Sequence, residues 1–163
     1  MKMSFEDWLA NGHLKRHVSS RDELEKLYRV IRRDIKAAGN RKMDDDWRFV
    51  AAYNAALQSA GAALKAAGYE VHKAGGAHFQ TIESLKLTIR DDGTIVDPLQ
   101  KFRAKRGGGI YEETEIASDQ EIKELRKLAN ELFDKVRAYI SANHPALAPK
   151  EPRRNVAIRT FHF

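Results

Sequence analysis

The order of apolar and polar positions predicts α-helices over most of the chain. In residues 20–39, apolar side chains recur every three or four positions, as on one face of a helix. Ser20 and Glu23 have the spacing of an N-terminal capping box, and Gly39 follows the last apolar position. The amphipathic helix predicted here has an apolar face made of Leu24, Leu27, Tyr28, Ile31 and Ile35.

A second helix is expected over residues 44–68, where apolar or small residues occupy most of the circumference. Acidic residues at positions 44–46 suit its N-terminus because they complement the helix dipole. A helix that is apolar on most sides is typical of the centre of a bundle. Its larger apolar residues are Trp47, Val50, Tyr53, Leu57 and Leu64.

Two shorter helices are expected in the next part of the chain. Residues 78–89 have a helical pattern, although their Thr and Ile residues also allow a strand. Asp97 is suited to the N-cap of a following helix, with Pro98 at its first position. This helix would continue into a basic segment at residues 101–106.

A long helix follows the second capping box of the chain, formed by Ser118 and Glu121. Helices joined by short loops predict an all-α protein, an antiparallel four- to five-helix bundle. We expect one helical domain over residues 1–143 and a basic tail at 144–163 that is either flexible or docked on a partner. The apolar stripe of the long helix consists of Ile122, Leu125, Leu132, Val136 and Ile140.

Charge and cysteine usage narrow the classes of function. The chain has 29 Lys and Arg against 23 Asp and Glu, a net charge of +6, which favours a polyanionic partner such as nucleic acid. The absence of cysteine excludes disulfides and thiolate chemistry and suits a reducing cytoplasm. Because no apolar run has the length of a membrane span, we expect a cytoplasmic protein without membrane contact.

The segment "KFRAKRGGGIYEE" at residues 101–113 combines four cations, three glycines and a tyrosine. Arg103 and Arg106 fall along the edge of the apolar stripe that Leu99 and Phe102 begin, so both are expected to face one cleft. One guanidinium group can donate two parallel hydrogen bonds to the oxygens of a phosphate, and glycines let a ligand approach the backbone closely. The alternative is a solvated basic turn at a helix C-terminus, where cations suit the dipole.

Three segments, at residues 44–71, 75–85 and 99–113, together resemble the HEPN superfamily, the higher eukaryotes and prokaryotes nucleotide-binding domain. The likeness is to a small bacterial branch with an Ala-Tyr-Asn-Ala-Ala-Leu helix, here residues 52–57, and a later Arg-x-x-Arg-Asn-x-x-x-Tyr motif. It extends over about residues 44–142. The resemblance implies an all-α bundle, often a homodimer, whose catalytic members are metal-independent ribonucleases of toxin-antitoxin and defence systems.

The family signature places a histidine four to six residues after an arginine, with the sites of two protomers meeting in one cleft. Carried onto this chain, the arginine is Arg106 with Arg103 as its companion, and Tyr111 occupies the histidine position. Gly107 stands where an asparagine usually follows the arginine. A phenol with a pKa of about 10 is a poor base at neutral pH, so Tyr111 is expected to donate a hydrogen bond to phosphate or to stack on a base.

His78 is a candidate for the missing base, because it lies in the second resembling segment and would face the arginines if the two helix ends adjoin. The alternative is a cap or loop histidine. Asn54 is either a satisfied core amide or a residue that orders the cleft. Together with the catalytic candidates, the residues expected to bind substrate are Lys101, Lys105, Gly107 and Asn54.

No metal or cofactor is expected. His13 and His17 have the i, i+4 spacing of a zinc pair, but neither a glutamate after the first histidine nor a third ligand is evident. From the resemblance, the leading hypothesis is a HEPN-type protein that binds RNA at a cleft of Arg103, Arg106 and Tyr111 and acts as a metal-independent endoribonuclease, as a toxin or defence component with an antitoxin or a nucleotidyltransferase as partner. The alternatives are a non-catalytic module that binds a nucleotide or a neighbouring nucleotidyltransferase, and a plain helical scaffold.

Overall fold

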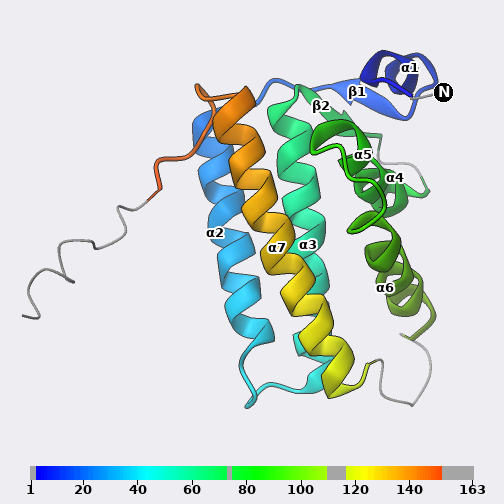
Figure 1. Ribbon diagram of the computed structural model, residues 1–163, viewed down its shortest axis with the longest axis vertical. Helices are drawn as coiled ribbons and strands as arrows, with labels where there is room; N and C mark the ends of the chain where they lie inside the picture. Colours follow the sequence, from blue (N-terminus) through cyan, green and yellow to red (C-terminus); the bar gives the residue numbers. More distant parts are fainter. Residues whose placement is uncertain (1–2, 73–74, 110–116, 152–163) are drawn as a thin grey trace, which may run out of the picture.

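The computed structural model describes residues 3–72, 75–109 and 117–151. These residues form a helical bundle with a two-stranded sheet at one end (Figure 1). The prediction of an all-α bundle is confirmed, and the small sheet was not predicted. The elements are α1 (Phe5–Ala10), β1 (Leu14–Arg16), α2 (Arg21–Ala38), α3 (Asp45–Ala66), β2 (Tyr69–Val71), α4 (Ala77–Glu83), α5 (Leu85–Thr88), α6 (Val96–Gly109) and α7 (Asp119–Asn143).

Helix α3 lies at the centre of the bundle. It packs against α2 and α7 on one side and against α4, α5 and α6 on the other (Figure 1). Small side chains allow this crowding, because they let neighbouring backbones approach closely. Trp47, expected in the core, is instead 64% exposed, since it lies on the first turn of α3 and about 200° around the helix from buried Phe49. The fully buried alanines of α3 are Ala52, Ala55, Ala56, Ala60, Ala62 and Ala63.

The directions of the helices follow from how the chain crosses the bundle. Both α3 and α7 run antiparallel to α2 and therefore parallel to each other, because α4, α5 and α6 return the chain to the end where α3 began (Figure 1). Buried Arg48 connects the three helix ends that meet there. Its Nε donates to the carbonyl of Ala38, and its Nη1 lies 3.1 Å from Asp45 and 3.3 Å from Asp119.

The helix caps agree with the sequence in part. Ser118 and Glu121 form the complete capping box expected at the start of α7. Ser20 caps α2 by accepting a hydrogen bond from the backbone of Glu23. The Glu23 side chain does not complete that box, because His17 and a lysine of α3 engage it instead.

Helix α6 begins at Val96, slightly earlier than expected. Asp97 is consequently the second residue of the helix and not its N-cap. The helix start is held by Asp91, whose carboxylate accepts hydrogen bonds from the backbone of Gly93, Ile95 and Val96. An anionic oxygen on these amides fulfils the role that the sequence assigned to Asp97.

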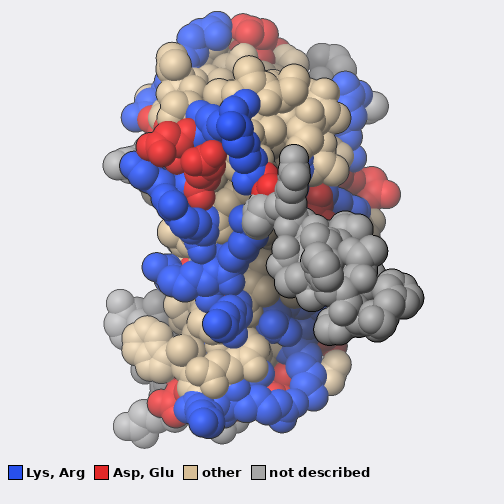
Figure 2. All heavy atoms as spheres, turned by 90° about the vertical axis from the view of Figure 1, so that its left-hand side faces the viewer, with Lys and Arg blue, Asp and Glu red and all other residues tan. Residues whose placement is uncertain are grey.

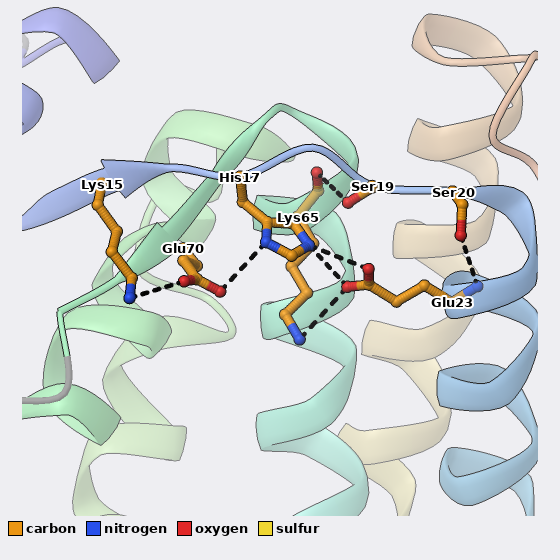
Figure 3. A network of polar contacts seen from close by, with 7 residues as sticks. All are labelled: Lys15, His17, Ser19, Ser20, Glu23, Lys65 and Glu70. Carbon is orange, nitrogen blue, oxygen red and sulfur yellow. Dashed lines mark hydrogen bonds and ion pairs between the residues drawn. The ribbon is translucent and has the colours of Figure 1, made fainter.

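The two strands are antiparallel, with Leu14 of β1 opposite Val71 of β2. His17, directly after β1, ties this sheet to the bundle (Figure 3). Its Nε2 lies 2.8 Å from Glu23 of α2, and its Nδ1 lies 3.3 Å from Glu70 of β2. Because both ring nitrogens contact carboxylates, one on α2 and one on β2, the role of His17 is to connect the sheet to the bundle. In the described parts of the chain, no group of three or more His, Asp or Glu side chains has an arrangement that could hold a metal ion.

The first part of the basic tail packs on its own bundle. Leu147 and Ala148 contact the core, and Glu151 forms ion pairs with Arg32 of α2 and Arg137 of α7. Residues 152–163 lie outside the described residues. Of the helices in the described segments, none has both the length and the apolar character needed to cross a bilayer.

Candidate functional site

Helix α6 carries the two arginines of the basic segment toward α3 and α4. Its apolar residues anchor it, since Leu99 is fully buried and Phe102 lies 6.1 Å from Phe49 of α3, measured between ring centroids. Arg103 and Arg106 follow this anchored stripe at its edge. The spacing of the sequence therefore places both guanidiniums on one side of the helix.

Arg103 is held by contacts between α6 and α4. Its guanidinium carbon lies 5.4 Å from the ring centroid of Phe79, and its Nε donates to Oε1 of Gln100 at 2.6 Å. The Gln100 amide in turn donates to the carbonyl of Phe79 and to the carboxylate of Glu83. These contacts fix the position of the cation without an ion pair to it.

Arg106 lies over the ring of Tyr53, with 5.2 Å between its guanidinium carbon and the ring centroid. Its Nε is buried and has no hydrogen-bond partner among the described residues. A buried N–H without an acceptor is costly, and the same feature occurs at Arg21 and Arg137 outside this site, so the position of the guanidinium over Tyr53 is the more informative observation. Burial raises the pKa of Tyr53 to about 12, although the charges of Arg106 and Arg103 act in the opposite direction, so the phenol is neutral at pH 7.

His78 stands beside this pair, in the first turn of α4. Its Nδ1 lies 3.2 Å from the hydroxyl oxygen of Tyr53, which orients the ring, while the residue as a whole is exposed. Partial burial lowers the pKa of His78 below its ordinary value of 6.5, and the positive charges of Arg106 and Arg103 lower it further. The imidazole is therefore predominantly neutral at pH 7.

The site thus combines an accessible neutral imidazole with two cations. Neither Arg103 nor Arg106 has a carboxylate within ion-pair distance among residues 3–72, 75–109 and 117–151. Uncompensated guanidiniums next to an imidazole suit a phosphate group and a proton transfer beside it. We call Arg103, Arg106, His78 and Tyr53 the arginine–histidine site.

The structure does not bring every expected residue to the arginine–histidine site. Lys105 forms an ion pair with Glu121 of α7, so its charge is compensated there. Asn54 faces α2, where its amide nitrogen donates to Asp34 at 2.5 Å. This hydrogen bond between helices fits the core amide, the first of the two interpretations of Asn54.

Two other residues expected at the site are exposed to solvent, and a third lies outside the residues that the structure describes. Lys101 is exposed on α6. A Cβ at Gly107 would meet no atom within 4 Å, so no close approach inside the described part of the protomer requires glycine there. Tyr111 lies outside the described residues. A hollow of about 750 Å³ near α5 and α7 contains no member of the arginine–histidine site.

Tyr53, which belongs to the arginine–histidine site, and Phe79 and Gln100, which hold Arg103 in place, were not predicted from the sequence. Tyr53 was assigned to packing, which is correct for its ring, since the residue is 1% exposed. A signal was nevertheless present, because Tyr53 precedes Asn54 in the resembling helix and Phe79 follows His78 directly. Neither of these neighbouring positions in the sequence indicates by itself that Arg106 will lie over the ring of Tyr53 or Arg103 over the ring of Phe79.

No family model, curated protein or solved structure matches this chain. The geometry of the arginine–histidine site therefore carries the functional argument.

Proposed function

We propose that the protein binds RNA at the arginine–histidine site and cleaves it without a metal ion, as an endoribonuclease of HEPN type in a toxin or defence system. The observation that supports this most strongly is the hydrogen bond between His78 and Tyr53 beside two guanidiniums that have no carboxylate partner among the described residues. It combines a neutral base with the cations that a phosphate requires.

The proposed reaction is attack of an RNA 2′-oxygen on the adjacent phosphorus. When Nδ1–H of His78 donates to the Tyr53 hydroxyl oxygen, Nε2 carries a lone pair and accepts the 2′-hydroxyl proton. The new bond joins the 2′-oxygen to phosphorus, and the bond from phosphorus to the 5′-oxygen breaks. Water protonates this oxygen, and the hydroxide ion that forms takes the proton from Nε2 of His78, so the base is restored. The products are a 2′,3′-cyclic phosphate and a 5′-hydroxyl end.

The arginines would act on the charge that develops on the phosphate oxygens. Arg106 is held over the ring of Tyr53, and Arg103 is fixed by its bond to Gln100, so both cations are positioned before substrate arrives. Preorganised donors of this kind stabilise a transition state more than mobile ones, because little reorganisation is needed during the reaction. Tyr111 and Lys101 are proposed to add contacts to the RNA.

The family resemblance adds partners to the proposal. A homodimer would bring two arginine–histidine sites into one cleft, and an antitoxin would bind the protein and restrain its activity. A second candidate function is a non-catalytic module that binds a nucleotide or a nucleotidyltransferase. It is favoured by Gly107 and Tyr111, which occupy the asparagine and histidine positions of the signature.

An RNA substrate series in the presence of chelator tests the proposal. We expect the protein to cleave single-stranded RNA under these conditions and to leave 2′,3′-cyclic phosphate ends, as detected by mass spectrometry. A single 2′-deoxy substitution should abolish cleavage at that linkage alone, because the nucleophile is missing there. Cleavage of a fully 2′-deoxy strand or a requirement for added Mg²⁺ would contradict this mechanism. Binding without turnover would support the non-catalytic module.

A further inference from the structure

A groove lined mainly by cations runs between α2 and α7. In the bundle, α2 lies on the side opposite α6 (Figure 1). Helices α2 and α7 pack closely on α3 and much less on each other, which leaves a furrow between them. Three hollows of about 430, 540 and 320 Å³ follow this furrow, and Arg126 lines all three. Two carboxylates, Glu131 and Asp134, also line these hollows, and the cations of the α2–α7 groove outnumber them: Arg32, Arg33, Lys36, Arg41, Arg48, Lys123, Arg126, Lys127 and Arg137.

Figure 2 faces the α2 side of the molecule and shows Lys and Arg side chains gathered across its middle and lower parts, with most acidic side chains above them. The contacts agree with this separation. Arg32 and Arg137, at one end of the groove, pair with Glu151, and Arg137 also pairs with Asp134 of the groove lining. Farther along, Lys36, Arg41 and Lys127 have no ion pair within the described ranges of the chain.

Arg126 is fixed in the groove by backbone. Its Nε donates to the carbonyl of Ile35 at 2.9 Å, in the last turn of α2. Its guanidinium lies against Gly39, where an added Cβ would stand only 2.8 Å from the guanidinium carbon. A helix C-terminus favours a cation at this place, and no described carboxylate neutralises it. Arg126 is therefore a preorganised cation with charge available to a ligand.

The linear arrangement indicates the kind of ligand. Arg32 and Lys36 are four residues apart, which separates them by about 6 Å along the helix axis, and Arg41 continues the row beyond the helix end. This step is comparable to that between phosphates of an extended nucleic-acid strand. A row of cations suits a chain of regularly spaced anions better than one isolated phosphate.

The lining favours a nucleic-acid backbone over an acidic protein. Protein interfaces usually have an apolar or aromatic centre. The large hydrophobic residues exposed on the described part of the surface are Met3, Val18, Trp47 and Phe79, and none of them lines the α2–α7 groove.

We infer that the α2–α7 groove binds the phosphate backbone of an RNA strand, at a distance from the linkage being cleaved. This rests on the proposed function for the choice of RNA as the ligand. The groove adds affinity for long strands through their backbone and contributes nothing to the chemical step. Recognition of phosphate alone makes this contribution independent of base sequence.

A binding measurement with matched variants tests the inference. A fluorescent twenty-nucleotide RNA, made uncleavable by 2′-fluoro substitution, is titrated in chelator at several salt concentrations. Lys36→Glu/Lys127→Glu removes two cations of the groove, whereas Lys26→Glu/Lys135→Glu changes the same total charge on the same two helices, at positions that line none of its hollows. Lys36→Gln/Lys127→Gln repeats the test with milder substitutions, and circular dichroism checks that every variant is folded.

We expect the groove variants to bind the strand at least tenfold more weakly at low salt, and the control variant to lose much less. The slope of log affinity against log salt should fall by about 1.4 for two lost contacts to a single strand. Equal losses in groove and control variants would overturn the inference, because net charge alone would then explain the binding. Binding of polyglutamate in place of RNA, lost in the groove variants, would also overturn it and indicate a protein partner.

A dinucleotide substrate separates this inference from the proposed function, because it is too short to occupy both surfaces. Cleavage of the dinucleotide by the groove variants at the wild-type rate, together with weak binding of the long strand, supports both proposals. If the dinucleotide is not cleaved by any form but long-strand binding still depends on the groove, the proposed function fails and the groove stands. If cleavage occurs but long-strand binding is unchanged, only the groove fails.

Discussion

Replacing Arg106 with alanine is expected to lower kcat/KM for RNA cleavage by about a hundredfold or more. Loss of one preorganised donor to a developing negative charge typically costs a factor of 10² to 10³. Arg106 meets that description, because its guanidinium is held over the ring of Tyr53 and has no carboxylate partner among the described residues. Arg106→Lys should recover only part of the rate, since an ammonium preserves the charge without the planar pair of donors.

Arg16→Ala is the matched control for this experiment. Arg16 also lies over a tyrosine ring, that of Tyr69, at 5.9 Å, but it belongs to the sheet and not to the arginine–histidine site. Its loss should leave kcat/KM within about twofold of the wild type. Equal rates for Arg106→Ala and Arg16→Ala, with both proteins folded, would show that Arg106 takes no part in cleavage.

His78→Gln is expected to lower the cleavage rate by about 10² to 10⁴, the usual contribution of a general base. The wild-type rate should rise with pH through a pKa below 6.5 and then level off, because burial and the charges of Arg106 and Arg103 favour the neutral imidazole. The rate rises with pH because a general base must be unprotonated, and the lowered pKa of His78 makes the unprotonated imidazole available at a lower pH. The measurement is kcat/KM from pH 5 to 8.

Two further variants make this profile diagnostic. Arg103→Gln removes one charge that lowers the pKa of His78, so the acid limb of the profile should move to higher pH. His72→Gln serves as the control, because His72 is exposed and lies outside the site. An acid limb that persists unchanged in His78→Gln would assign the titration to another group.

Much of the fold could be predicted from periodicity and caps, because these signals are local. The apolar stripe of α7 and its capping box fix both its type and its start. The sheet escaped prediction since each strand has three residues, too few for an alternating pattern. The prediction that Trp47 is buried was wrong for a different reason. An apolar side chain does not by itself indicate whether its face of the helix is covered by other helices.

The candidate site was predictable only where its residues share one helix. Arg103 and Arg106 lie three positions apart, so their common side follows from helical geometry. The position of His78 depends on α4 packing against both α3 and α6, which no local pattern encodes. The same limitation applies to Asn54, whose partner Asp34 is twenty residues away in sequence.

An NMR titration of the histidine rings tests the central claim most directly. The imidazole resonances of the protein are followed while an uncleavable RNA strand is added in chelator, and the pKa of His78 is measured in the free protein. We predict a pKa below 6.5 for His78 and a large shift of its ring resonances on binding, with little change at His72. A strand that binds without affecting His78 would contradict the assignment of the arginine–histidine site as the place where RNA is bound and cleaved.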